Sequence, residues 1–161
     1  MEFHPKVSCT LRGHPFLKGL DPRHMDALSA CSEERAFQPG EYLWRQGDVS
    51  EWLYLIDSGE VSLEISIPNE GPFPLEAAVA GEILGWPWME TSDRVRFDAR
   101  AVTPVIAVAL KGQAVREKCE ADERLGYEIL KRYSRVTSES LERMRLRLIK
   151  IGPATEQNRV L

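Results

Sequence analysis

The segment at residues 60–67 constrains the fold more than any other part of the chain. Its residues alternate between polar and apolar, with Val61, Leu63, Ile65 and Ile67 on one side. A period of two predicts a strand with one buried face, because successive side chains of a strand point to opposite faces. Further short apolar runs lie at residues 42–44, 53–56, 75–79 and 105–110, and glycines or prolines separate them. Many short strands at this spacing predict a β-sandwich or jelly roll over residues 41–111.

Helical patterns flank the predicted strands on both sides. Residues 1–40 are predicted to form an N-terminal helical cap, in which Asp21 is the N-cap and Pro22 the first helical residue. Residues 112–151 are predicted to be helical again, with a short helix at 114–119 and a long helix at 122–151. Gly152-Pro153 is expected to end that helix and to leave residues 152–161 as a tail. The predicted class is therefore mainly β with helices (α+β).

The long helix carries an apolar seam near its end. The seam residues follow 3-4-3 spacing, which is typical of a coiled coil: Leu141, Met144, Leu148 and Ile151. A homodimer through this seam is one interpretation, and folding of the helix back onto its own sandwich is the other. Basic residues on the helix are interleaved with acids, as on a solvated helix face. About ten residues follow, too few for a helix-turn-helix, so we expect no direct DNA binding by this chain alone.

Composition argues against several function classes. The 161 residues suit one domain, and no apolar run approaches the roughly 20 residues that span a bilayer. Three scattered cysteines fit free thiols in a reducing cytoplasm, which is the expected location. All three histidines lie within the first 25 residues, outside the predicted strands, so we expect neither a metal site nor an enzyme.

A glycine pattern at residues 43–59, LWRQGDVSEWLYLIDSG, gives the fold a more specific identity. It contains a Gly47-Asp48 turn, the apolar run 53–56 and a second glycine at Gly59. This resembles the cyclic-nucleotide-binding domain of bacterial catabolite-activator-type regulators, protein kinase regulatory subunits and gated channels. The resemblance covers roughly residues 11–150 and implies a double-stranded β-helix, or jelly roll, with short N-terminal helices and a long C-terminal helix.

The same resemblance implies a ligand site in the loop 81–97. The family's phosphate-binding cassette begins Gly-Glu-(Leu/Ile), as do Gly81, Glu82 and Ile83. By resemblance, Glu82 would accept a hydrogen bond from a ribose hydroxyl. The amides of Ile83 and Leu84 would face the phosphate at the start of a helix.

The second half of the cassette departs from the family pattern. Val95 stands where the family has arginine, Arg96 where it has Ser or Thr, and Phe97 where it has alanine. Arg94 and Arg96 flank the vacant place, but one step along an extended segment reverses side-chain direction. The predicted ligand-binding residues are therefore Gly81, Glu82, Ile83, Leu84, Arg94 and Arg96. The expected ligand is a cyclic nucleotide or another small anion, with cyclic AMP itself not favoured.

Two aromatic residues and one acid bear on whether this site is open. Trp86 and Trp88 either cover a planar ligand or fill the cavity, and Asp98 would repel phosphate if it faced inward. We therefore predict a non-catalytic, signal-sensing regulatory domain whose long helix transmits the output. The alternative is a scaffold of the same fold that binds no ligand and recruits a separate regulatory partner.

Overall fold

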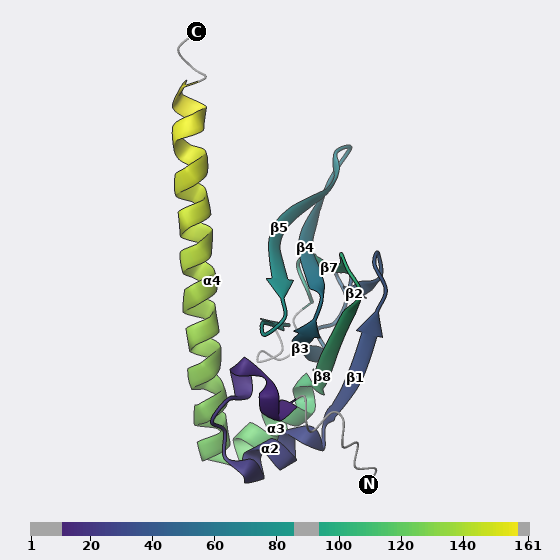
Figure 1. Cartoon of the computed structure of the whole chain (residues 1–161), viewed down its shortest axis with the longest axis vertical. Helices are drawn as coiled ribbons and strands as arrows, with labels where there is room; N and C mark the ends of the chain where they lie inside the picture. The colour runs from purple at the N-terminus through teal and green to yellow at the C-terminus, as the bar shows by residue number, and fades with distance from the viewer. Residues whose placement is uncertain (1–10, 86–93, 158–161) are drawn as a thin grey trace.

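The computed structural model describes the backbone of residues 11–85 and 94–157, and the side chains of the same residues as far as residue 150. Two four-stranded antiparallel sheets face each other (Figure 1). One contains, in order, β1 (Ser32–Phe37), β8 (Val105–Lys111), β3 (Trp52–Ser58) and β6 (Ile83–Leu84). The other contains β2 (Tyr42–Trp44), β7 (Asp98–Ala101), β4 (Glu60–Ile67) and β5 (Gly71–Val79). This arrangement confirms the predicted jelly-roll class.

The interior between the sheets is apolar and built largely from small residues. Val61 lies opposite Ala101 in the β4–β7 pairing, and Leu63 lies opposite Ala99. Tyr54 is the largest fully buried side chain, and its ring lies 5.9 Å from those of both Phe37 and Trp44. Alanines at β7 and β8 leave room for these rings, so the two sheets can approach closely.

The outer face of the β3–β8 sheet is also apolar, because the helices pack on it. These helices are η1 (Pro15–Leu17), α2 (Pro22–Ser29), α3 (Gly112–Ala121) and α4 (Glu123–Gln157). A second core lies between them and the sheet, with Leu28, Leu55, Leu110 and Leu125 at its centre. Asp21 caps α2 by accepting a hydrogen bond from the Arg23 amide at 2.9 Å, which confirms the predicted helix start.

The predicted helical cap of residues 1–40 is wrong at its end, because β1 begins at Ser32 and pairs with β8. The strand escaped detection because it lies at a sheet edge. An edge strand with little buried surface carries no strict polar–apolar alternation. The β structure therefore starts nine residues earlier than the predicted boundary at residue 41. The division of the chain into cap, roll and C-terminal segment otherwise stays a prediction.

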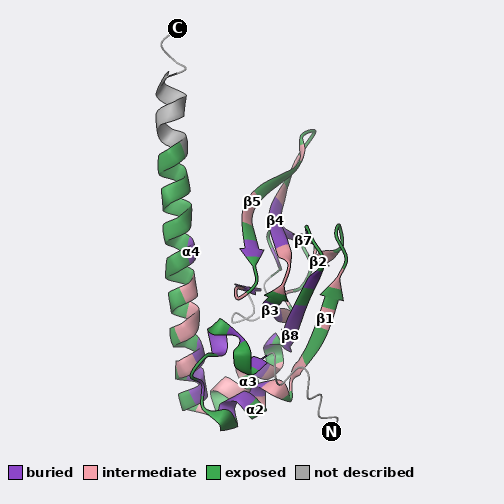
Figure 2. Ribbon diagram, viewed as in Figure 1, coloured by how far each residue is buried: buried purple, intermediate pink, exposed green. Residues whose placement is uncertain are grey.

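The end of the long helix was also predicted wrongly. Helix α4 runs through Gly152-Pro153 and ends at Gln157, within the stretch predicted as a tail. Proline removes one amide donor, yet the released carbonyl belongs to Ile149, which is 66% exposed and can bond to water. Figure 2 shows that burial of α4 is concentrated in its first turns, and that the helix then rises largely exposed beside the β4–β5 hairpin, with Ser140 buried on the way.

Within the described residues, no helix is both long and apolar enough to cross a membrane. The same residues contain no group of three or more His, Cys, Asp or Glu side chains placed to bind a metal ion.

Candidate functional site

Gly81 and Glu82 form a tight turn directly after β5. The Gly81 amide donates to the Ile56 carbonyl at 2.8 Å, and Gly81 has φ +90, which disfavours other residues. The Glu82 amide donates to the Val79 carbonyl at 3.0 Å, while Oε2 of Glu82 accepts from the Val79 amide at 3.0 Å. These reciprocal bonds fix the Glu82 carboxylate at the start of the loop.

A buried histidine ties the N-terminal helices to this turn. His14 Nε2 lies 3.2 Å from the same Ile56 carbonyl that Gly81 uses, and its Nδ1 accepts from the Phe16 amide at 3.3 Å. Burial lowers the pKa of His14 below its ordinary value of 6.5, which favours the neutral ring. The neutral ring can therefore donate at one nitrogen and accept at the other.

Ile83 and Leu84 do not begin a helix, which corrects the expectation for their amides. They form β6 and pair with Leu55 and Tyr54 of β3. Both side chains are buried, Ile83 in the core under the helices and Leu84 between the sheets. Their contribution to the site is a rigid edge rather than an anion-binding helix terminus.

The first half of the cassette lines a small cavity closed by α4. Its volume is about 80 Å³, and it is lined by Leu63, Glu76, Ala77, Ala78, Gly81, Glu82, Ile83, Leu84, Val136, Glu139, Ser140 and Arg143. Small-molecule sites usually measure roughly 300–1,000 Å³. A nucleotide therefore requires α4 or the loop to move before it can enter this cavity.

Polar contacts hold α4 against the cassette and β5. The Ser140 hydroxyl donates to Glu76 at 3.2 Å, and the Arg143 guanidinium lies 3.2 Å from Glu76 and 3.5 Å from Glu82. One turn further along, Arg147 donates to the Leu75 carbonyl. The helix is thus attached to Glu82, one of the residues that the family resemblance assigns to the ligand.

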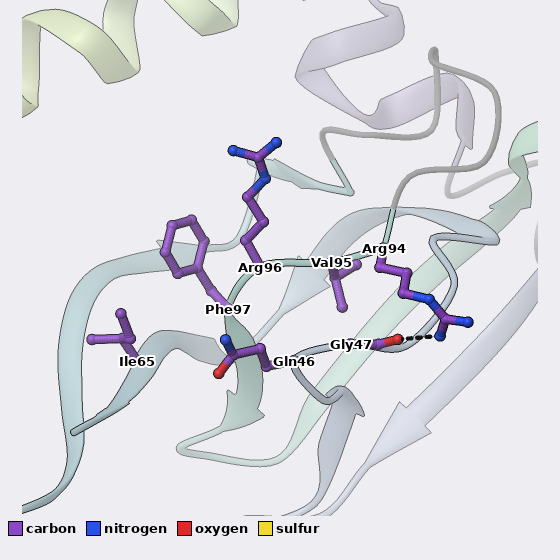
Figure 3. A pocket seen from close by; sticks show the side chains of 7 residues that line it. All are labelled: Gln46, Gly47, Ile65, Arg94, Val95, Arg96 and Phe97. Carbon is purple, nitrogen blue, oxygen red and sulfur yellow. Dashed lines mark hydrogen bonds between the residues drawn. The ribbon is translucent and has the colours of Figure 1, made fainter. Parts of the chain in front are cut away.

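The returning arm of the loop lies at a second, open hollow of about 710 Å³, which Figure 3 shows. Arg94 turns onto the Gly47 carbonyl at 2.7 Å, whereas Arg96 points away from it. Between them, Val95 is 5% exposed, and its amide and carbonyl each bond to the Gly47-Asp48 turn at 2.9 Å. Neither arginine lines the cavity that contains Glu82.

Asp98 and the Phe97 carbonyl accept hydrogen bonds from the end of β2 and from the segment that follows it. Asp98 is buried and accepts from the Gln46 amide at 2.7 Å, with Arg45 Nε 3.6 Å away. Phe97 is 41% exposed, and its carbonyl accepts from Trp44 Nε1 at 2.8 Å. Trp86 and Trp88, whose role was left open between lid and cavity filler, lie outside the described residues.

A partly buried ion pair links β7, the strand that leaves the cassette, to β4. Arg100 on β7 makes two bonds to Glu64 on β4, at 3.1 and 2.5 Å. The hydrogen bonds from Arg100 lower the pKa of Glu64 below its ordinary 4.5. Sequence reasoning missed this pair because the two residues are far apart in the chain and become neighbours only through strand pairing.

Sequence reasoning also missed the contribution of α4 to the cavity. Ser140, Arg143 and Arg147 recur at i, i+3, i+7 spacing and continue the face that buries Leu125 and Ile129. A polar continuation of an apolar stripe was the available signal, since residues at that spacing share one helix face.

Comparisons with known proteins agree with this architecture. The cyclic AMP receptor protein of Thermus thermophilus is 34% identical over 53 residues, which amount to 33% of this chain and 24% of that protein. A cyclic nucleotide-binding domain from Methylobacillus flagellatus superimposes with a TM-score of 0.75 at 20% identity, covering 91% of this chain and 82% of that one. The regulatory subunit of a cAMP-independent protein kinase A from Trypanosoma brucei gives 0.66 at 24% identity, covering 88% and 51%.

The two structural matches establish the fold alone at these identities, and the Thermus match covers only a fraction of either protein. A family model covers much more of the chain. The model for the cyclic nucleotide-binding domain matches residues 34–122, from β1 through the jelly roll to the start of α4. The chain therefore belongs to the cyclic nucleotide-binding domain family.

Proposed function

We propose that the protein is a non-catalytic regulatory domain that senses a small molecule at the cassette and transmits its occupancy through α4. The observation that carries the proposal is the attachment of α4 to the cassette through Arg143 and Glu82, 3.5 Å apart. A ligand at Glu82 would change the contacts that hold the helix. Such a ligand shifts the helix only if it binds the two helix positions with different affinity.

The ligand we propose is a cyclic nucleotide or another small anionic molecule that carries a hydroxyl group for Glu82. Glu82 supports the hydroxyl, because a carboxylate accepts hydrogen bonds. The anionic group requires a guanidinium or backbone donors, and Val95 occupies the family's arginine position. Arg94 and Arg96 are the nearest candidates in sequence, although both line the other hollow.

The second candidate is a scaffold that binds no ligand and recruits a regulatory partner. One specific observation favours it: both oxygens of the Glu82 carboxylate already have partners within the chain, the Val79 amide and the Arg143 guanidinium. A carboxylate whose two oxygens already have partners, at a cavity of about 80 Å³, is poorly placed to accept a hydrogen bond from an incoming molecule. The two candidates share the fold and differ only in whether a ligand displaces Arg143.

Calorimetric titration separates these candidates. Cyclic AMP, cyclic GMP and cyclic dinucleotides are each titrated into the protein, and heat at micromolar concentration supports the sensor. Glu82→Ala should then abolish binding. Loss of binding in Arg94→Ala or Arg96→Ala identifies which arginine binds the anionic group of the ligand. Absence of heat with every ligand, from protein shown to be folded, favours the scaffold.

We also propose that the protein is a homodimer through the α4 seam of Leu141, Met144, Leu148 and Ile151. Leu141, Met144 and Leu148 are 46%, 44% and 68% exposed, as expected for a seam without its partner helix. Met144→Glu should yield a monomer by light scattering. The matched control Leu146→Glu, off the seam and 52% exposed, should leave the dimer intact. A wild-type monomer at micromolar concentration would contradict this assembly.

The cytoplasm is the location we propose. Cys31 and Cys119 are both free thiols, and unpaired cysteines persist in a reducing compartment.

A further inference from the structure

The contact between α4 and the jelly roll is organised around one arginine. Arg143 reaches two carboxylates in different parts of the fold, Glu76 within β5 and Glu82 at the start of the cassette. Ser140 and Arg147 flank it on the same helix face and bond to Glu76 and to the Leu75 carbonyl. These contacts lie beyond the buried apolar residues of the first turns of α4, and they tie the second half of the helix to the roll.

Glu82 uses its two oxygens differently. Oε2 accepts from the Val79 amide and closes the turn, so it is needed for the conformation of the loop. Oε1 faces Arg143 at 3.5 Å. Oε1 is therefore the oxygen that an incoming hydroxyl donor would use, and the guanidinium of α4 already neutralises it.

The charges around the cavity give Arg143 a second role. Glu76, Glu82 and Glu139 all line this small space, and Arg143 is the one cation among the described residues that line it. The Glu76 side chain is only 16% exposed, so water screens its charge weakly. Without a counter-ion these carboxylates would repel one another.

We propose that Arg143 competes with the ligand for Oε1 of Glu82. In the unliganded protein the Arg143 guanidinium pairs with Glu82 and latches the second half of α4 to the roll. A ligand hydroxyl that bonds to Oε1 of Glu82 displaces the guanidinium and so releases the helix. The latch rests on the proposed function only in taking Glu82 as the acceptor of the ligand. The docking of α4 by Arg143 is independent of any ligand.

The exposure of the Arg143 side chain limits how strongly its ion pairs hold α4. The Arg143 side chain is 48% exposed, so its loss should shift the docking equilibrium by only about two- to fivefold, as for other partly exposed ion pairs. Because the ligand binds only the form in which α4 is released, the measured affinity is the intrinsic affinity multiplied by the fraction of molecules in that form. Removal of Arg143 should therefore raise ligand affinity by the same factor.

Hydrogen exchange tests the latch without a ligand. The full chain is compared as wild type, Arg143→Gln and the control Arg145→Gln. The control removes an arginine two residues away whose ion pair, among the described residues, is with Glu142 at 3.7 Å. Amides of residues 139–147 should exchange about two- to fivefold faster in Arg143→Gln, with no change in the control. Equal exchange in the two variants would overturn the latch.

Calorimetry with cyclic AMP as the probe supplies the second arm. Binding that is tighter in Arg143→Gln than in the wild type, or that is detectable only in this variant, supports competition. Weaker binding in Arg143→Gln overturns it, because Arg143 would then be part of the ligand site. No binding to either protein excludes cyclic AMP as the ligand, and the hydrogen-exchange result then decides the latch by itself.

Discussion

Replacing Arg100 by methionine tests whether the buried ion pair holds the strand that follows the cassette. The Glu64 side chain is 3% exposed, and both of its oxygens bond to Arg100. Methionine keeps most of the aliphatic volume of arginine but removes the guanidinium. Arg100→Met therefore leaves a buried carboxylate without its counter-ion.

The expected loss in the free energy of unfolding depends on the burial of Glu64, the partner that remains. Removing one member of a buried ion pair typically costs about 3–5 kcal/mol. The Arg100 side chain is 33% exposed, so water can reach part of this site and the loss should be nearer about 2–3 kcal/mol.

The loss should depend on pH in a defined direction. In the wild type the pKa of Glu64 is lowered, chiefly by the hydrogen bonds from Arg100, so the pair stabilises the protein above the ordinary value of 4.5. That stability is lost as pH falls through the lowered pKa. In Arg100→Met, burial without the guanidinium raises the pKa of Glu64, so acid protonates the carboxylate and removes its penalty. The difference between the two proteins should narrow as pH falls from neutral toward 4.5.

Urea unfolding followed by circular dichroism at several pH values measures this difference. The double variant with Glu64→Gln should recover about 1 kcal/mol or more at neutral pH, because no buried charge remains. The reasoning is refuted if Arg100→Met costs under about 0.5 kcal/mol, the range of ordinary surface substitutions. A loss that is independent of pH would refute it as well.

Three further changes test other parts of the fold. Gly59→Ala should destabilise the protein by more than about 2 kcal/mol in urea unfolding, because φ is +91 and a Cβ would lie 2.2 Å from the Pro104 carbonyl oxygen. Ile129→Ala, at a side chain 2% exposed, should cost about 2–5 kcal/mol, whereas the 51% exposed neighbour Leu130→Ala should cost under about 0.5 kcal/mol. Burial lowers the pKa of His14, so the unfolded chain binds a proton first and wild-type stability should fall as pH drops below 6.5. His14→Gln should flatten that dependence in thermal unfolding, and an unchanged slope would exclude His14 as its cause.

The sensor and the scaffold differ in whether a ligand breaks the contact between Arg143 and Glu82. If a ligand displaces Arg143 from Glu82, the long helix becomes the output of the domain. If nothing displaces it, the same contact makes α4 a rigid arm that presents its exposed seam to a partner. The hydrogen-exchange and calorimetric experiments therefore bear on both interpretations.

The sequence by itself determined the class of fold and the family. Alternation at residues 60–67, the Gly47-Asp48 turn and Gly59 are local signals, since periodicity and backbone conformation depend on near neighbours. The start of α2 at Asp21 was predictable for the same reason. Prediction failed at edge strand β1, where the local signal was weak, and at the end of α4, where the helix continued in spite of the Gly152-Pro153 signal.

Only the tertiary structure decided how the site is composed. The sequence places Glu82 and Arg94 in one loop, but the fold puts them at two separate hollows. Arg143, 61 residues beyond Glu82 in the numbering, becomes its neighbour at 3.5 Å. No sequence period records such a contact, because it depends on the direction in which α4 leaves the roll. That direction is set by the packing of Leu125 and Ile129 against the helical core.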